Sequence, residues 1–234
     1  MKPSKICLAL DGLSAIQAID LTEKLGDRCH AVKIHDLFDA CGASIIRSLK
    51  ESGAKRVWVD AKLHDTKDTV ALRTAAIVRH GASIITVHAS GGIPMMRAAV
   101  EAAHHPDRMV AAEIWAITVL SSLDPREIGQ VYGRDQTPQQ IVTGFALMAK
   151  EAGVSGIVCS AQEVDRLSQY SKLKGLEFVV PGTRSVGADL GQQKRSGTPK
   201  QASDDGATFL VAGSQVTKAK DPVAAFDAFE AEIA

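Results

Sequence analysis

The chain has 234 residues, and its 27 basic and 27 acidic side chains give a formal net charge of zero. With 45% hydrophobic residues it can bury a sizeable core without disulfide bonds. The balanced charge argues against a polybasic surface for nucleic acid or for a membrane, so we expect a small-molecule partner.

Short apolar runs, most of them rich in β-branched residues, predict eight strands along the chain. In order they are Ile6–Leu10, Ala31–Ile34, Arg56–Ala61, Ser83–Val87, Met109–Leu120, Gly156–Cys159, Phe178–Val180 and Thr208–Val211. The first run meets Asp11 and has no cleavage pattern behind it, so we interpret it as a strand and not as a signal peptide. No run approaches the 18 apolar residues of a bilayer span.

Stretches with helical spacing of apolar residues lie between these runs. The clearest are Ile16, Ile19 and Leu25, then Ile141, Phe145, Met148 and Ala152, and finally Val223, Phe226, Phe229 and Ile233. This alternation predicts one (β/α)8 barrel domain over residues 1–234, with a doubly wound open sheet as the less favoured choice.

Two longer stretches do not fit a minimal barrel. Leu123–Thr137 follows the fifth predicted strand, and Gly182–Gly197 follows the seventh. Both leave the face of a barrel at which binding sites lie, and we interpret the second, which is polar and contains glycine, as a candidate lid.

The cysteines indicate a reducing compartment. Cys7, Cys29, Cys41 and Cys159 are widely and irregularly spaced and form no C-x-x-C pair. We expect reduced core residues in a cytoplasmic protein.

The most informative segment is the third predicted strand and the residues after it, Val57 to Asp65. Side chains alternate along a strand, so Asp60 and Lys62 point to the same face, about 7 Å apart. If Val57, Val59 and Ala61 pack against the helices, the two charges face the barrel axis. Burying them there costs several kcal/mol per ion unless they are paired.

Charges also stand on the first two strands, where Asp11 ends one and Lys33 lies within the other. We therefore predict that Asp11, Lys33, Asp60 and Lys62 converge at one mouth of the barrel. A structural ion-pair network, or strand-end charges in solvent, is the alternative interpretation. An ammonium between carboxylates stays protonated, so we expect Lys62 to donate a proton and to support a developing anion, not to form a Schiff base.

The signature Asp60-x-Lys62-x-x-Asp65, with Asp11 and Lys33 upstream, resembles the orotidine 5'-phosphate decarboxylases. Further stretches agree in order and spacing over essentially the whole chain: Val87-His-Ala-Ser-Gly-Gly92, Thr118-Val-Leu-Ser-Ser-Leu-Asp124, Gly156-Ile-Val-Cys-Ser-Ala-Gln-Glu163, Pro181-Gly-Thr-Arg184, Gln193-Lys-Arg195 and Thr198-Pro199.

This resemblance implies conversion of orotidine 5'-monophosphate to UMP and carbon dioxide, without metal or other cofactor, by a homodimeric barrel. It implies that Lys62 protonates C6 of the pyrimidine and that Lys33 and Asp60 hold the charges in place. It also implies that Asp65 enters the site of the neighbouring subunit. Substrate contacts are implied for ribose at Asp11 and Thr69, for the pyrimidine edge at Ser121, and for phosphate at Arg184, Gln193 and the backbone of Gly213 and Ser214.

The chain departs from the family pattern at three places. Ser214 stands where the family has an Arg that clamps the phosphate, so a bidentate contact is lost and Lys194, Arg195 and Lys218 become candidate substitutes. The run Asp65-Thr-Lys-Asp-Thr69 replaces the usual Asp-Ile-Pro-Asn-Thr, and His35 replaces a Gly.

Other candidate residues favour structural roles or stay open. His88 is either a ligand or base, or a hydrogen-bonded residue at a strand end, which we favour. Gly91-Gly92 fits a phosphate cradle as well as a tight turn. The seven histidines show no zinc-binding spacing, and no nucleophile elbow surrounds Ser121-Ser122.

Two other functions remain open beside the decarboxylase. A Mg²⁺-dependent sugar-phosphate lyase or synthase of the same superfamily shares Asp60-Ala-Lys62. A non-catalytic nucleotide-binding relative would have kept the charges and lost the phosphate clamp, and only Ser214 favours it.

Overall fold

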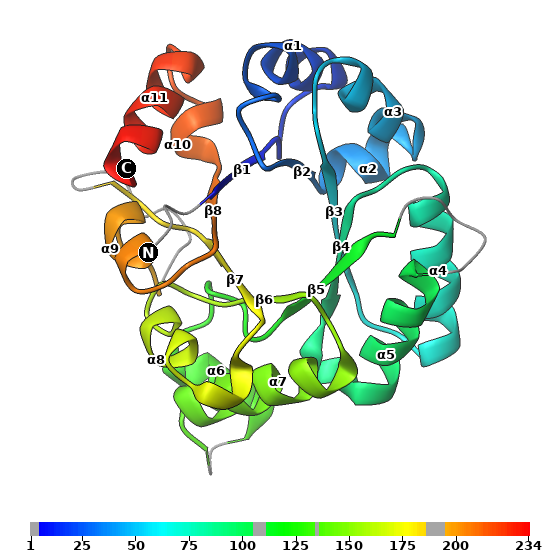
Figure 1. Cartoon of the computed structure of the whole chain (residues 1–234), viewed down its shortest axis with the longest axis vertical. Coiled ribbons are helices and arrows are strands. Elements are labelled where there is room, and N and C mark those ends of the chain that lie inside the picture. Colours follow the sequence, from blue (N-terminus) through cyan, green and yellow to red (C-terminus); the bar gives the residue numbers. More distant parts are fainter. Residues whose placement is uncertain (1–4, 105–110, 134–135, 186–194) are drawn as a thin grey trace.

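The computed structural model describes residues 5–104, 111–133, 136–185 and 195–234. Within these ranges eight parallel strands form a closed barrel in chain order, with helices around it (Figure 1). The strands are β1 (Lys5–Ala9), β2 (Ala31–Ile34), β3 (Val57–Leu63), β4 (Ile84–His88), β5 (Glu113–Ile117), β6 (Gly156–Val158), β7 (Glu177–Pro181) and β8 (Phe209–Ala212). Because β1 pairs with β8, the predicted barrel is confirmed and the open sheet is excluded.

The helices pack on the outside of this sheet. They are α1 (Ala15–Leu25), α2 (Asp36–Cys41), α3 (Ser44–Glu51), α4 (Lys67–Arg79), α5 (Gly92–Ala103), α6 (Pro125–Tyr132), α7 (Pro138–Ala152), α8 (Val164–Ser168), α9 (Pro199–Asp204), α10 (Ser214–Thr217) and α11 (Pro222–Glu232), with 3-10 turns η1 (Ala89–Gly91) and η2 (Ser171–Leu173).

Local sequence explains where several of these helices begin. A capping box opens α1 at Ser14, α6 at Asp124 and α7 at Thr137. In each, the side chain three positions on accepts a hydrogen bond from the backbone N–H of the cap residue. Proline at the first turn of α6 and α7 removes an N–H that would otherwise lack a partner. The stretch Leu123–Thr137 therefore contains a helix that the minimal barrel pattern did not predict.

The fifth strand was predicted too long. Met109–Leu120 was expected, but β5 spans only Glu113–Ile117, and Met109 lies outside the described residues. Thr118 and Val119 are buried coil, at 1% and 3% exposure. An apolar run cannot mark the end of a strand when the chain stays buried beyond it. The helix predicted from Ile16, Ile19 and Leu25 is confirmed as α1, although Ile16 is 73% exposed and the helix buries Ala18, Leu21 and Leu25.

The core forms two layers. A large cluster, which includes Val57 and Val59, lies between the sheet and the helices, while a smaller cluster fills the barrel. Inside the barrel Trp115 contacts Trp58 edge-on, with ring centroids 4.8 Å apart, and stacks on Phe209 at 5.1 Å. These rings fill the interior of the barrel.

Cys7, Cys29 and Cys159 are buried, as expected of core residues, whereas Cys41 is half-buried, and none of the four is paired in a disulfide in the structure. Burial raises the pKa of the Cys29 thiol to about 12. Within the described ranges no helix combines the length and the hydropathy that crossing a bilayer needs.

Candidate active site

A cavity of about 660 Å³ opens at the mouth where the strands end. Its lining includes residues from the carboxyl ends of the strands or the loops that follow them, and Trp58 of the inner cluster lies at its base. Among the lining residues are Asp11, Lys33, Asp60, Lys62, Ser121, Arg184, Gly213, Ser214 and Lys218. The cavity therefore has the position at which barrel enzymes bind substrates.

Four side chains of alternating charge form a continuous chain of contacts along this cavity, as the sequence predicted. Lys33 Nζ lies 2.7 Å from Asp11 Oδ2 and 3.4 Å from Asp60 Oδ2. Lys62 Nζ lies 2.5 Å from the same Asp60 oxygen. The inner pair, Lys33 and Asp60, keeps only 8% and 10% of its side-chain surface exposed, against 33% for Lys62 and 47% for Asp11.

The contacts stabilise the charged forms of the two buried groups. Burial alone would favour neutral Asp60, but the ammonium groups of Lys33 and Lys62 outweigh it and hold the pKa of this carboxyl below its usual value. Burial likewise opposes the charge on Lys33, yet Asp60 and Asp11 raise the pKa of its ammonium. Both groups are therefore ionised at neutral pH.

Lys62 adopts a backbone conformation that the strand pattern did not predict. Its φ is +46°, and among the described residues it is the only non-glycine residue with positive φ. The pairing of β3 with β4 shifts register between Val59 and Leu63, and the Lys62 N–H donates instead to Thr86 Oγ1 at 3.1 Å. Sequence reasoning missed Thr86, although a polar residue inside the apolar run Ile84–His88 was a visible signal.

A second contact anchors the loop that carries Asp11. The N–H of Gly12 donates to the carboxylate of Asp36, the first residue of α2, at 3.1 to 3.2 Å. The loop after β1 is thus tied to the loop after β2.

The structure brings most, but not all, of the predicted substrate contacts to the cavity. Ser121, Arg184, Gly213 and Ser214 line it. Asp65 and Thr69 do not, since Asp65 is exposed and Thr69 lies in the first turn of α4 with its hydroxyl accepting from Thr66. Gln193, and residues 186–194 of the candidate lid with it, lie outside the described residues.

Arg195 does not face the cavity, so it cannot replace the missing phosphate clamp. It is 5% exposed and forms an ion pair with Glu163, itself 7% exposed. Its remaining N–H groups donate to the carbonyl oxygens of Val119, Leu120 and Leu123. Glu163 in turn accepts from the N–H and hydroxyl of Ser160. Arg195 therefore fastens the loop after β5, which carries Ser121, to the loop after β6.

Of the other candidate clamps, Lys194 lies outside the described residues, whereas Lys218 lines the cavity together with Arg184 and Ser214. Lys218 thus brings a cation to the cavity four residues, or about one helical turn, after Ser214.

His88 and Gly91-Gly92 do not line the cavity. His88 contacts His64, with ring centroids 5.7 Å apart, and burial lowers its pKa. A Cβ on Gly91 would lie 2.1 Å from the sulfur of Met95, and Gly92 has a φ of +87°. The glycines therefore serve the tight turn into α5 and not a phosphate cradle.

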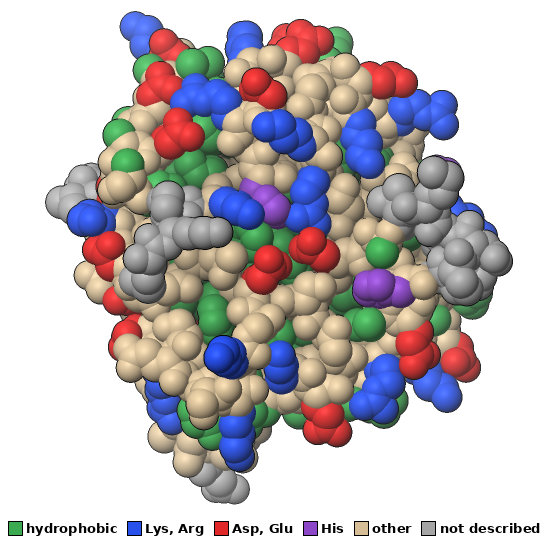
Figure 2. Space-filling model, in the orientation of Figure 1, with side chains coloured by type: hydrophobic (Ala, Val, Ile, Leu, Met, Phe, Trp, Pro, Cys, Tyr) green, Lys and Arg blue, Asp and Glu red, His purple; other side chains and the backbone are tan. Residues whose placement is uncertain are grey.

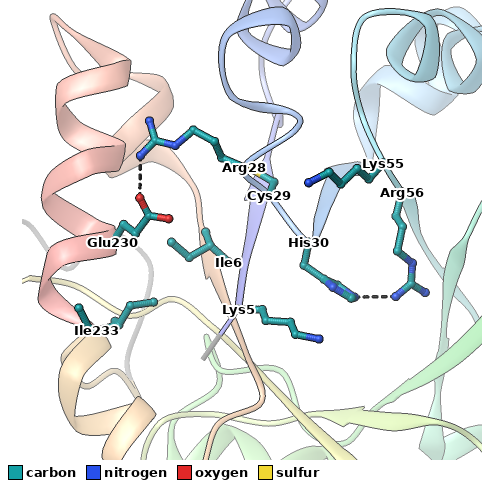
Figure 3. A pocket seen from close by; sticks show the side chains of 10 residues that line it. Lys5, Ile6, Arg28, Cys29, His30, Lys55, Arg56, Glu230 and Ile233 are labelled. Atoms are coloured by element: carbon teal, nitrogen blue, oxygen red, sulfur yellow. Dashed lines mark hydrogen bonds and ion pairs between the residues drawn. The ribbon is translucent and has the colours of Figure 1, made fainter. Parts of the chain in front are cut away.

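A second cavity, of about 670 Å³, lies at the opposite mouth, where the strands begin. Figure 2 shows basic, acidic and histidine side chains gathered over the middle of the barrel on this face, and Figure 3 shows Lys5, His30 and Arg56 across it. Arg28 pairs there with Glu230 at 2.6 Å.

Arg56 makes two polar contacts in this mouth. Its guanidinium donates to His30 Nε2 at 2.6 Å and pairs with Glu113 at 2.7 Å. Burial lowers the pKa of His30 to about 4, so its ring is neutral and accepts this bond. Cations at this end are held in contacts within the fold, in keeping with a stabilising role for this face of a barrel.

Comparison with known proteins shows which family this chain resembles. Residues 4–229 match the model of the "Orotidine 5'-phosphate decarboxylase / HUMPS family". A protein named orotidine 5'-phosphate decarboxylase from Pseudoalteromonas translucida is 40% identical over 95% of this chain and 94% of its own length. The protein of that name from Nitrosococcus oceani is 39% identical over 100% and 99%.

A solved structure of a decarboxylase also has the same fold. The crystal structure of orotidine 5'-phosphate decarboxylase from Lactobacillus acidophilus superimposes with a TM-score of 0.82 at 29% identity, covering 98% of this chain and 99% of that one.

We predict that Arg195→Met lowers the free energy of unfolding by about 3–5 kcal/mol, because it leaves the buried carboxylate of Glu163 without its cation. Urea denaturation measures this loss. The control is Lys200→Met, which removes the exposed pair of Lys200 with Asp204 and should cost no more than about 0.5 kcal/mol. Equal losses in the two variants would contradict the anchoring role of Arg195.

Proposed function

The chain belongs to the orotidine 5'-phosphate decarboxylase / HUMPS family and decarboxylates orotidine 5'-monophosphate to UMP in pyrimidine biosynthesis, and we propose that Lys62 supplies the proton for this reaction. As a carbon–carbon lyase, it breaks the bond between C6 and the carboxylate. The electron pair of that bond stays on C6 as carbon dioxide leaves. A proton from the ammonium of Lys62 then forms the new C6–H bond, and solvent returns a proton to the amine.

One observation supports this role above all: the Lys62 ammonium faces the cavity and is held at 2.5 Å by Asp60. A charge fixed in a largely buried network needs no reorganisation when C6 becomes negative, and such preorganised charges stabilise transition states strongly. In our proposal Asp60 and Lys33 hold this array in place.

The cavity volume suits a nucleotide, since small-molecule sites commonly span about 300–1,000 Å³. We assign the ribose hydroxyls to Asp11, which is fixed by Lys33 and partly exposed at the mouth. Ser121 is assigned to the pyrimidine edge. Gln193, which lies outside the described residues, is proposed to bind the phosphate as well.

For the phosphate we propose Arg184 and Lys218, beside the backbone of Gly213 and Ser214. The loops after the neighbouring strands β7 and β8 carry these residues, which is where barrels commonly bind phosphate. Lys218 would then supply the charge that Ser214 lacks.

We also propose that two copies of the chain form a homodimer with shared sites. Asp65 follows Lys62 by three residues, yet its side chain is exposed and outside the cavity of its own chain. This placement supports a role for Asp65 in the site of a neighbouring subunit, with Thr69 at the same helix end. The free thiols support our proposal that the enzyme works in the cytoplasm.

A Mg²⁺-dependent sugar-phosphate lyase or synthase of the same superfamily is the second candidate, because such an enzyme would share Asp60-Ala-Lys62 and the matched family model names a HUMPS group beside the decarboxylases. The donor set favours the decarboxylase. Both oxygens of Asp60 already accept contacts, Oδ2 from two ammonium groups and Oδ1 from Thr86, so a cation would have to displace them. We propose that the reaction needs neither metal nor another cofactor.

We predict that Lys62→Ala lowers kcat about 1,000-fold or more, because it removes both the proton donor and the positive charge. Loss of ultraviolet absorbance as orotidine 5'-monophosphate becomes UMP measures the rate, with EDTA present. Lys24→Ala, a change on the outer helix α1, is the control and should leave kcat unchanged. An active Lys62→Ala variant would refute the proposed role of Lys62.

Wild-type activity that EDTA abolishes and Mg²⁺ restores would favour the second candidate, the Mg²⁺-dependent enzyme. Absence of wild-type turnover at millimolar substrate would favour a non-catalytic nucleotide-binding protein.

The phosphate assignment predicts opposite effects at two neighbouring positions. Lys218→Ala should raise KM about 10-fold or more by removing a charge-assisted contact, and Ser214→Arg should lower it. Initial rates over a range of substrate concentrations measure both. Lys220→Ala, an exposed lysine outside the cavity, should leave KM unchanged. If Ser214→Arg raises KM and Lys218→Ala leaves it unchanged, the phosphate is held elsewhere.

The shared-site proposal predicts complementation between two inactive variants. Lys62→Ala and Asp65→Ala chains, unfolded together and refolded in equal amounts, should recover about a quarter of wild-type activity. Half of the dimers are then mixed, and each carries one complete site. Each variant refolded alone is the control. If the mixture stays inactive although both variants refold as dimers, Asp65 acts in its own chain.

A further inference from the structure

The hydroxyl of Thr86 connects the two charged residues of β3 that the proposed mechanism uses. Thr86 lies in the middle of β4, next to β3, and is fully buried. Its Oγ1 donates to Asp60 Oδ1 at 2.7 Å and accepts from the backbone N–H of Lys62 at 3.1 Å. One side chain thus contacts both the carboxylate of Asp60 and the backbone of Lys62.

The contact to Lys62 falls where the sheet is irregular. The β3–β4 register shifts between Val59 and Leu63, so the Lys62 N–H meets the Thr86 hydroxyl in place of a backbone carbonyl. Residues other than glycine adopt a φ such as the +46° of Lys62 only where surrounding contacts hold them in it. This hydroxyl is such a contact.

The contact to Asp60 decides where its carboxylate points. Asp60 Oδ2 lies 2.5 Å from Lys62 Nζ but also 3.4 Å from Lys33 Nζ, so a turn of the carboxylate toward Lys33 is within reach. With Oδ1 held by Thr86, Oδ2 stays directed at Lys62. Only a group that both donates and accepts can make the two contacts at once, and a hydroxyl does so.

We propose that Thr86 is a positioning residue for the decarboxylation: its hydroxyl holds the Asp60 carboxylate and the turned backbone of Lys62 together, and thereby aims the Lys62 ammonium at C6. This inference rests on the proposed roles of Lys62 and Asp60. It assigns Thr86 no contact with substrate and no proton transfer.

The test compares substitutions that keep the volume of Thr86 and change its hydrogen bonding. Thr86→Val keeps the shape and loses both contacts, whereas Thr86→Ser keeps the hydroxyl and loses a methyl group. Thr86→Cys keeps a weaker donor and acceptor. Thr74→Val is a matched control, because Thr74 is equally buried, on α4, and its hydroxyl has no hydrogen-bond partner among the described residues.

We expect Thr86→Val to lower kcat about 10- to 100-fold, the effect of losing a hydrogen bond to a charged group, with KM changed less than about 2-fold. Thr86→Ser should keep kcat within about 3-fold of the wild type, and Thr86→Cys should fall between the two. Thr74→Val should leave both constants unchanged. Thermal unfolding of each variant identifies any that fails to fold. If Thr86→Val fails to fold, the test rests on kcat of the other two variants, which should be higher in Thr86→Ser than in Thr86→Cys.

Unchanged kcat in Thr86→Val, or Cys as active as Ser, would overturn the proposal. So would a variant in which KM alone rises, because the hydroxyl would then act on substrate binding. These outcomes leave the decarboxylase function standing, since the wild type and Thr74→Val remain active. A wild-type chain without turnover would contradict the proposed function and, with it, this inference.

Discussion

A carboxylate buried between two ammonium groups is the constraint on which the rest of the site depends. Asp60 keeps 10% of its side-chain surface exposed, and an uncompensated charge at such depth would be strongly destabilising. Lys33 and Lys62 supply the compensation, and Asp11 pairs with Lys33 in turn. Each charge is thus compensated by its neighbour, and an array of fixed charges suits the proposed stabilisation of a developing carbanion.

The strands and the segments that follow them have different roles in the site. The strands carry the buried charges above a floor of packed rings at Trp58, Trp115 and Phe209. Residues beyond the strands carry the proposed substrate contacts, and polar side chains hold these segments. The exposed Asp36 binds the loop with Asp11, and the buried Arg195 binds the loop with Ser121. Substrate recognition can therefore vary at positions beyond the strands, such as Ser214 and Lys218, while the charge array stays the same.

Both mouths of the barrel carry charged side chains, but these side chains have different surroundings. At the mouth where strands begin, Arg28 and Arg56 are paired with carboxylates of neighbouring elements. Where strands end, the charges face an open cavity beside polar loop residues. The two cavities are similar in size but differ in their expected role. The direction of the strands distinguishes them, because barrels bind substrates at the mouth where the strands end.

The amino-acid sequence alone predicted the order of the strands and favoured the closed barrel and the four converging charges, and the structure confirms all three. Strand and helix periods are local patterns, and a charge inside an apolar strand is visible from its neighbours alone. Seven of the eight strands begin within one residue of the predicted start. The end of β5 was predicted too late because buried coil continues its apolar run.

Only the tertiary structure decided which cation serves the cavity and what holds Lys62 in place. Arg195 and Lys218 look alike as candidate clamps in the sequence, yet one is buried against Glu163 and the other lines the cavity. The left-handed turn at Lys62 and its bond to Thr86 depend on a register shift between two strands. Such contacts join residues far apart in the chain, and local periodicity carries no information about the distance between them.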